Sequence, residues 1–374
     1  MTQGACKNCV RRSWLLTAMS RCLEEHASDR AVLLELLALT DMELIDAIGD
    51  RRRGELRARY ARFTTKDVPP TTGVERICRH NRDYPSALKN NGAPRMLHVA
   101  GAAERLQAIR AQPTVAIVGS RKATDYGMEM ARSLARGLAA SGVTVAASLW
   151  DGIALAAHAG ALEVDGKTLM AMEGGLDIPC AARRRQLLER VRRTGCVVAE
   201  LPCGFGARGN SWCYTARERV VVGVAELTVV VEADESSIEL LAPRIAKTLG
   251  RSVAAVPGRV TSPVSRGTHA LLRGGATLVR GPRDVLELLG RGRTLRTPRL
   301  QRKPPATAEI EPRLLATLEQ VGAGCDTPAK LTAGVADAGE VLLALSELEV
   351  MGLLGRGDGG RYVPRESLAG VAAL

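Results

Sequence analysis

Aromatic residues are scarce in this chain: two Phe, five Tyr and three Trp make up 3% of its 374 residues. The core must therefore be built from aliphatic side chains, and each aromatic residue has to be placed separately. Hydrophobic residues nevertheless reach 46% and charged residues 25%, so a core of normal size is possible. The length predicts two or three domains.

Long apolar runs are also missing. No stretch approaches the ~18 consecutive apolar residues of a membrane span. The first residues, MTQGACKNCVRRSWLL, lack the apolar centre of a secretion signal. We therefore expect a cytoplasmic protein without membrane-spanning segments.

A disulfide framework is not expected either, because the cysteines are odd in number and irregularly spaced in a long chain. We expect free thiols, with no metal or cofactor. The alternative is that Cys6-x-x-Cys9 forms half of a zinc site, for which Cys22 and His26 are the nearby candidates, at an unusual spacing. The nine cysteines are Cys6, Cys9, Cys22, Cys78, Cys180, Cys196, Cys203, Cys213 and Cys325.

Acidic residues are fewer than basic ones. The chain has 40 Asp and Glu and 52 Lys and Arg, which gives a formal net charge of +12. Such a balance favours polyanionic partners, with nucleic acid first and anionic lipid second. A solubilising charge or a general arginine bias is the alternative explanation.

The spacing of apolar residues divides the chain into regions. Residues 12–63 show helical periodicity and predict a small helical domain, in which Ser28 or Asp29 can cap the second helix and Thr40-Asp41 the third. From about 113 to 290, short apolar strands alternate with helices, which predicts a Rossmann-like α/β domain with a doubly wound, mainly parallel sheet. The strands are expected at 114–118, 143–147, 167–172, 196–200, 227–233, 251–257 and 276–279, and helices at 124–141, 153–164, 183–194, 214–225, 236–249 and 267–274.

Residues 291–308 are basic, contain proline and lack periodicity, so they are expected to form a linker. Residues 309–364 predict three helices and a hairpin, the order of a winged-helix domain. Its third helix, 337–350, carries Glu340, Glu347 and Glu349, which repel phosphate. A protein-contact role is therefore favoured over duplex DNA binding.

The turn after the first core strand offers a phosphate site. Gly119 permits a tight turn, Ser120 supplies a hydroxyl, Arg121 and Lys122 supply charge, and the next helix points its N-terminal amides the same way. An ordinary strand-to-helix turn that requires a glycine is the alternative. Downstream, His158 is expected to be structural rather than catalytic. Trp150 is expected to pack, with stacking on a base as the alternative.

A glycine-rich loop leads into the helix at 214–225. It places Trp212 and Tyr214 beside Arg208, Arg217 and Arg219. Aromatic faces for bases and cations for phosphates are what single-stranded nucleic acid requires. A buried Tyr214 with solvated arginines is the alternative interpretation.

Taken in order, these motifs resemble the DNA-processing protein A (DprA/Smf) family. The resemblance runs over roughly residues 84–280. It rests on VAIVGSRKATDYG (115–127), GIALAAHAGAL (152–162), GGLDIP (174–179), AELPCG (199–204), YTARERVVVGV (214–224), VVEADESS (230–237), AVPGRVTS (255–262) and RGTHALLRGGA (266–276).

The resemblance implies a Rossmann-like domain, here residues 76–290, that binds single-stranded DNA without cleaving it. It implies a homodimer that protects incoming DNA and helps to load RecA recombinase in natural transformation or recombination. It also fits a helical N-terminal domain of sterile-alpha-motif or helix-hairpin-helix type. The DNA-binding residues that it implies are Gly119, Ser120, Arg121, Lys122, Tyr214, Arg217 and Arg219.

The chain departs from the family pattern at several loop positions. The family loop S-G-x-A-x-G-I-D is replaced by residues 147–154, with Ser148, Trp150 and Ala154 at changed positions. The family's R-N-R has Glu218 at its centre here, and Ser237 replaces a glycine. These changes put the preservation of DNA binding in question.

Two other functions remain open on the same fold. One is a sensor that binds a small nucleotide. The other is a nucleotide N-glycoside hydrolase of the LOG type, which needs a glutamate after a P-G-G-x-G-T pattern. Pro257-Gly258 is followed by Arg259 and Val260, without that glutamate. A non-enzymatic role is therefore expected.

Overall fold

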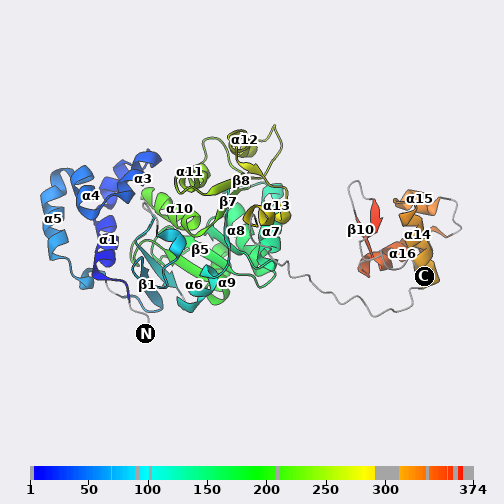
Figure 1. Cartoon of the computed structure of the whole chain (residues 1–374), viewed down its shortest axis with the longest axis horizontal. Coiled ribbons are helices and arrows are strands. Elements are labelled where there is room, and N and C mark those ends of the chain that lie inside the picture. The colour runs from blue at the N-terminus through cyan, green and yellow to red at the C-terminus, as the bar shows by residue number, and fades with distance from the viewer. Residues whose placement is uncertain are drawn as a thin grey trace. The chain divides into compact units, whose positions relative to one another are not determined.

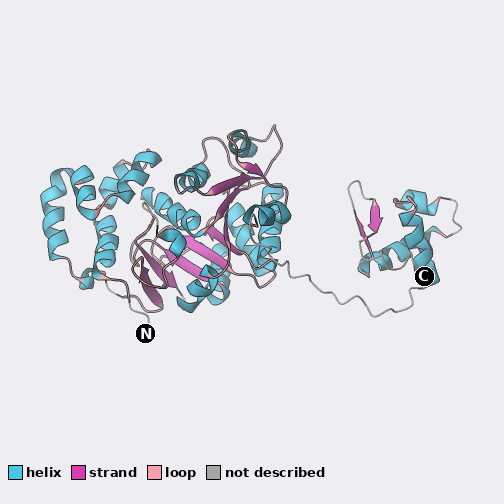
Figure 2. Cartoon of the chain, viewed as in Figure 1, coloured by secondary structure: helices cyan, strands magenta, loops and turns pink. Residues whose placement is uncertain are grey.

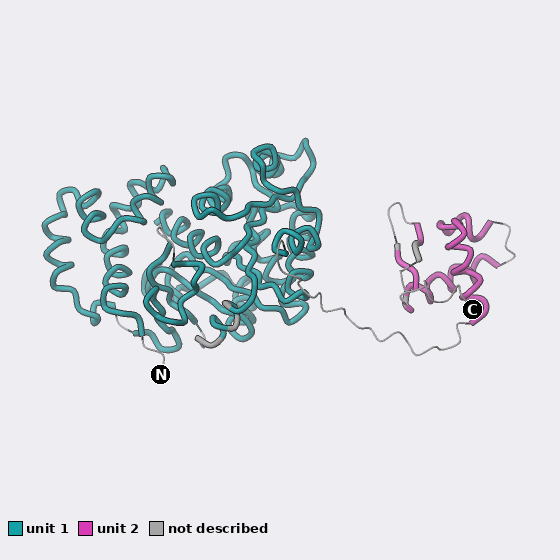
Figure 3. The backbone as a smooth tube through the Cα atoms, in the orientation of Figure 1, with its two compact units in different colours: residues 1–298 teal, residues 299–374 magenta. Residues whose placement is uncertain are grey.

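The computed structural model describes residues 4–290, apart from 69, 90–92, 101–102 and 207–209, and residues 311–364, apart from 334–336, 352 and 357–360. The chain divides into two compact units, Met1–Pro298 and Arg299–Leu374 (Figure 3). The predicted linker, Arg208 and the Gly-Asp-Gly-Gly turn lie outside the described residues.

Unit 1 is built on a nine-stranded sheet of order β1-β2-β6-β5-β4-β3-β7-β8-β9 (Figures 1 and 2). Strands β3 to β9 pair in parallel, whereas β2 is antiparallel to both β1 and β6. This confirms the predicted Rossmann-like fold. The strands are β1 (Val74–Cys78), β2 (Met96–Ala100), β3 (Thr114–Val118), β4 (Thr144–Ser148), β5 (Thr168–Met172), β6 (Cys196–Ala199), β7 (Leu227–Val230), β8 (Ser252–Ala255) and β9 (Thr277–Leu278).

The strand order places a switch point at β3. From β3 the chain winds through β4, β5 and β6 in one direction, and through β7, β8 and β9 in the other. The loops after β3 and β7 therefore diverge and leave a crevice at the carboxyl ends, where ligands bind in open α/β sheets. The turn that begins at Gly119 lies at this switch point.

Helices cover both faces of the sheet, because its strands are apolar on both sides. Helices α7 and α8 pack on each other and, with α13, cover one apolar cluster, while α10 and α11 cover another. The region predicted as one helix at 236–249 is a short 3-10 turn followed by α11. The helices are α6 (Ala103–Arg110), α7 (Asp125–Ala140), α8 (Ile153–Leu162), α9 (Ala182–Thr194), α10 (Trp212–Val224), α11 (Leu241–Thr248), α12 (Arg266–Arg273) and α13 (Pro282–Leu289).

Five helices form the N-terminal region, and the caps predicted from the sequence are present. Asp29 accepts hydrogen bonds from the amides that begin α3, and Thr40 forms a capping box with Glu43 at α4. Their apolar faces share one cluster with Trp212 and Ala216 of α10, so the region packs on the α/β core. The helices are α1 (Lys7–Ala18), α2 (Ser20–Glu25), α3 (Arg30–Ala38), α4 (Asp41–Ile48) and α5 (Arg53–Arg62).

A buried ion pair holds the first helices together. Arg12 Nη1 lies 3.1 Å from Asp41 Oδ1, and Arg95 approaches the same carboxylate at 3.2 Å. Burial lowers the pKa of Arg12 to about 10, which Asp41 opposes. Tyr60 donates its hydroxyl to the second oxygen of Asp41 at 2.8 Å. A buried charge requires such partners, so this network fixes α1 against α4 and α5.

Unit 2 contains α14 (Pro312–Gly322), α15 (Pro328–Thr332), α16 (Ala338–Val350) and the antiparallel pair β10 (Leu354–Arg356) and β11 (Tyr362–Pro364). Leu318, Leu345 and Tyr362 are among the residues of its own apolar cluster. The winged-helix assignment of this unit stays a prediction. Across the described parts of both units, no helix combines the length and apolar character needed to cross a bilayer.

Two histidines are buried inside unit 1. His158 contacts Thr168 Oγ1 at 2.7 Å and the Ser148 carbonyl at 3.2 Å, and its ring is fully buried. His98 lies 3.4 Å from the hydroxyl of Ser13. Desolvation lowers the pKa of both rings to about 4, so both are neutral at pH 7. His158 therefore has the structural position expected from the sequence.

We predict that unit 1 loses stability as the pH falls from about 6.5 to about 4. In this window the unfolded histidines, with a pKa of about 6.5, bind protons that the folded rings do not bind. Each contributes a decrease of at most about 1.4 kcal/mol per pH unit to the free energy of unfolding. Urea denaturation between pH 7.5 and 4.5 measures the slope. His158→Gln should have a shallower slope than the wild type, and equal slopes would contradict the prediction.

Candidate nucleic-acid interface

The turn after β3 is held tightly in place. A Cβ atom at Gly119 would lie 2.8 Å from both the Glu232 carbonyl oxygen and Ile153 Cγ1, so no larger residue fits. The Ser120 amide donates to the same carbonyl at 2.6 Å, and the Ser120 hydroxyl accepts from the Lys122 amide at 3.1 Å. Gly119 and Ser120 thus shape the turn, while Arg121 and Lys122 are exposed.

The start of α7 does not form the expected phosphate cradle. The carboxylate of Glu232, which follows β7, accepts hydrogen bonds from the Thr124 amide at 2.9 Å and its hydroxyl at 2.6 Å. Glu232 is 2% exposed. A buried carboxylate already satisfies the positive end of this helix, and its charge would repel a phosphate. The cations of the turn remain available, whereas the buried charge of Glu232 disfavours a phosphate at the start of α7.

Next to this turn, arginines and aromatic rings gather around Trp150. The guanidinium carbons of Arg121, Arg184 and Arg217 lie 4.6, 5.2 and 5.9 Å from the centre of the Trp150 ring. The Tyr214 ring lies 5.8 Å from that of Trp150. We call these five residues the arginine–aromatic cluster. They come from the turn after β3, the loop after β4, α9 and α10.

Carboxylates pair with the cluster. Trp150 Nε1 donates to Glu173 at 2.7 Å, and Arg217 contacts Glu173 at 3.3 Å and Glu218 at 2.6 Å. Arg121 lies 3.5 Å from Glu239. Arg217 is only 7% exposed, so these carboxylates offset the cost of burying its guanidinium group. Glu218, one of the departures from the family pattern, therefore reduces the positive charge that Arg217 presents.

A further ion pair orients the Trp150 loop. Asp151 lies 3.2 Å from Arg184 and also pairs with Arg183. Partial burial opposes ionisation of Asp151, but hydrogen bonds and attraction from the two arginines outweigh it and lower its pKa. Asp151 is therefore ionised at neutral pH and anchors α9 to the loop after β4.

A cleft of about 680 Å³ lies beside the cluster, at the carboxyl ends of β4 and β5. Trp150, Tyr214, Arg184 and Arg217 line one part of it, with Glu173 among them. The cleft lies at the carboxyl ends of the strands, as ligand sites of open α/β sheets do, but one to two strands away from the switch point at β3. Flat aromatic faces and guanidinium groups at one cleft can bind bases and phosphates together.

Arg219 does not join this cluster. Two residues beyond Arg217 on α10, it points about 200° around the helix, toward the N-terminal helices. It is 4% exposed and lies 3.1 Å from Glu200, whose pKa is raised because burial outweighs the attraction of Arg219 and Arg12. Arg219, which was expected to be a cation at the DNA-binding surface, is therefore a buried partner of Glu200.

Sequence reasoning missed two parts of this site. Arg184 was not singled out, because its only signal is a position near the start of a helix rich in arginine. The packing contacts expected for Trp150 are present, but the arginines that surround it were not foreseen together. The zinc alternative also considered the wrong neighbours: Cys22 packs in the N-terminal core, whereas Cys78 and His80 lie beside Cys6 and Cys9. They were missed because they are distant in sequence.

Comparisons with known proteins identify the family of this chain. The family profile of DNA recombination-mediator protein A matches residues 75–290. The putative DNA processing protein DprA of Mycobacterium tuberculosis is 38% identical over 260 residues, covering 69% of this chain and 66% of that protein. Protein Smf of Escherichia coli is 32% identical over 206 residues, covering 55% of this chain and 54% of that protein. The matched part thus spans slightly less than two thirds of the mycobacterial relative and about half of the Escherichia coli one.

Solved structures give the same result. DNA processing protein A from Streptococcus pneumoniae superposes with a TM-score of 0.59 at 25% identity, covering 76% of this chain and 98% of that one. The Helicobacter pylori protein, whose single-stranded DNA binding mode has been described structurally, has a TM-score of 0.50 at 22% identity and covers 58% of this chain and 95% of its own. The similarity to the Helicobacter pylori protein shows a shared fold. Because the profile covers more than half of the sequence, the chain belongs to the DNA recombination-mediator protein A (DprA/Smf) family.

Proposed function

We propose that this protein binds single-stranded DNA at the arginine–aromatic cluster, without cleaving it, and acts in DNA recombination. The observation that carries the proposal is Trp150 surrounded by Arg121, Arg184 and Arg217, with Tyr214 beside it. A base can stack on the rings while the arginines contact phosphates. Family membership and the net charge of +12 support it.

Each member of the site has a distinct role in this proposal. Arg121 and Lys122 contact phosphates directly, since both are exposed at the switch point. Gly119 and Ser120 keep the turn narrow, so the strand can approach the backbone. Tyr214 and Trp150 supply the stacking faces. Arg219, being internal, keeps α10 in place and does not touch the strand.

We further infer, from the family, that the protein acts in the cytoplasm as a homodimer and passes the bound strand to a RecA-type recombinase. Stacking and phosphate contacts do not use the base-pairing edges of the bases. A strand held in this way can therefore still pair with a complementary strand during recombination. Such a role requires no catalytic group. It also agrees with Glu173, the carboxylate in the cleft, being held by Trp150 and Arg217.

The double variant Arg121→Ala/Lys122→Ala is expected to weaken binding of oligo-dT and to reduce its salt dependence. Each lost phosphate contact removes about 0.7 from the slope of log K against log salt, so the slope should fall by roughly 1.4. Surface plasmon resonance at several salt concentrations measures this. Arg283→Ala, an exposed arginine on α13, is the matched control and should leave the slope unchanged. An unchanged slope in the double variant would place the DNA elsewhere.

Trp150→Ala should weaken oligo-dT binding by about 1–3 kcal/mol, the contribution of one stacked base. Trp150→Phe keeps an aromatic face and should retain most of the affinity. Calorimetric titration with oligo-dT and with single nucleotides separates the possible ligands. Tight binding of single nucleotides, with no gain for longer strands, would instead support the nucleotide-sensor alternative.

Replacing Glu218 by the asparagine of the family, Glu218→Asn, should strengthen DNA binding. It removes the carboxylate 2.6 Å from Arg217, while Glu173 still holds that guanidinium. The salt slope should become steeper by up to about 0.7, as one cation is freed for a phosphate. Affinity and thermal unfolding are measured together. Weaker binding with unchanged unfolding would show that Glu218 is needed to orient Arg217.

A further inference from the structure

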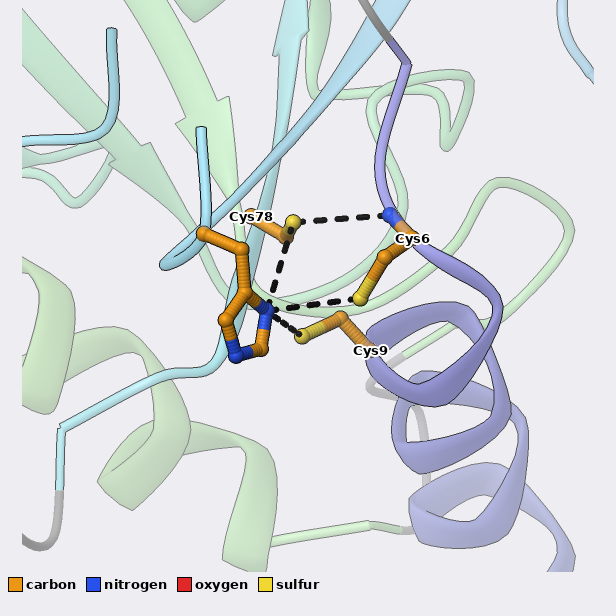
Figure 4. A group of neighbouring side chains, drawn as sticks. Cys6, Cys9 and Cys78 are labelled. Atoms are coloured by element: carbon orange, nitrogen blue, oxygen red, sulfur yellow. Dashed lines mark hydrogen bonds between the residues drawn. The ribbon is translucent and has the colours of Figure 1, made fainter. Parts of the chain in front are cut away.

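Four side chains of types that bind metals meet at the seam between α1 and β1. Cys6 is the residue that precedes α1, and Cys9 lies in its first turn. Cys78 ends β1, and His80 follows in the next turn. Figure 4 shows the three cysteines facing one another, and within the described residues this is the group able to hold a metal ion.

The distances have the size of a tetrahedral zinc shell. His80 Nδ1 lies 3.3 Å from Cys6 Sγ, 3.5 Å from Cys9 Sγ and 3.9 Å from Cys78 Sγ. All four donor atoms lie within 4.8 Å of one another. Zinc bonds of about 2.3 Å to sulfur and about 2.0 Å to nitrogen at tetrahedral angles require sulfur–nitrogen separations of roughly 3.6 Å. The mean of the three observed separations agrees with this value.

Hydrogen bonding alone does not account for this convergence. A single imidazole nitrogen has either one proton or one lone pair, so it can form one good hydrogen bond, whereas three sulfurs approach His80 Nδ1. Disulfide formation would use only two of the three cysteines. One cation bonded to all four atoms satisfies the whole group, and three thiolates with one imidazole form a closed structural set typical of zinc.

We propose that Cys6, Cys9, Cys78 and His80 bind one structural zinc ion, which fastens the start of α1 to the end of β1. Cys6 and His80 are 74 residues apart, so the ion closes a long loop. The apolar cluster beneath it is small: Cys9, Val10, Phe63, Val68, Cys78 and Met96. Metal binding therefore contributes stability that this seam would otherwise lack.

The site is separate from the proposed DNA interface. β1 is the edge strand, three positions from β5, the nearest strand that ends at the cleft, which corresponds to about 14 Å at the usual strand spacing of about 4.8 Å. The zinc proposal therefore does not rest on DNA binding. Failure of either proposal would leave the other unaffected.

Metal analysis of the full chain, expressed with added zinc and purified without chelator, tests the proposal. Mass spectrometry of the metals should find about one zinc per chain. Replacement by cobalt should give the near-ultraviolet thiolate band and visible bands of a tetrahedral site. The proposal would be overturned if the purified protein contained no zinc and its cobalt-loaded form showed no thiolate band. A stoichiometric content of iron in place of zinc would also overturn it.

Variants identify the ligands. Cys78→Ser and His80→Ala should lose most of the zinc, whereas His80→Cys, which restores four ligands, should retain it. Cys22→Ala is the matched control, a buried cysteine of the same region outside the group, and should keep a full complement. His80 is exposed, so His80→Ala is expected to stay folded, which circular dichroism checks. Full zinc content in both loss variants would refute the assignment.

Removing the metal also has a measurable effect on stability. A strong chelator should lower the melting temperature of the wild type and of Cys22→Ala, because zinc binds the folded seam and not the open chain. It should not change that of Cys78→Ser. An equal melting temperature with and without chelator, after complete zinc removal, would contradict a structural role.

Discussion

Burial of charge on α10 is the constraint around which unit 1 is arranged. Twelve of the thirteen residues of this helix are buried, and they include Arg217, Glu218 and Arg219. Because charges without partners are very costly inside a protein, neighbouring elements must supply counter-charges. Glu200 after β6 does so on one side and Glu173 after β5 on the other. The helix is thus fixed in rotation, with Tyr214 directed to the cleft.

Helix α10 also links the N-terminal helices to the α/β core of unit 1. Trp212 packs with the N-terminal helices and donates its indole N–H to Ser20 at 2.9 Å, whereas Tyr214 and Arg217 border the cleft. Helix α10 therefore contacts both the N-terminal helices and the cleft. The carboxylates around the cluster hold its arginines in place before any ligand arrives, which lowers the entropic cost of binding but also lowers the net positive charge. Affinity and orientation are balanced against each other at this site.

The sequence was informative where local patterns decide the structure. Apolar strands alternating with helices predicted β3 to β9 and α7 to α12 within about five residues, but not α6 or α13. The Thr40 cap and one of the two candidates for the preceding cap, Asp29, were identified correctly. β1 and β2 were missed, because short antiparallel strands outside the alternation lack a distinctive period. The ion pairs of Arg219 and the carboxylate at the start of α7 depend on residues far apart in sequence. No local pattern could reveal them.

The scarcity of aromatic residues gives the protein a built-in spectroscopic reporter. Of its three tryptophans, Trp14 and Trp212 lie in or against the N-terminal helices, and Trp212 is fully buried. Trp150 alone stands at the cleft, half-buried among guanidinium groups. Changes in intrinsic emission on adding a ligand therefore report on this cleft, with no label and with a constant background from the other two indoles.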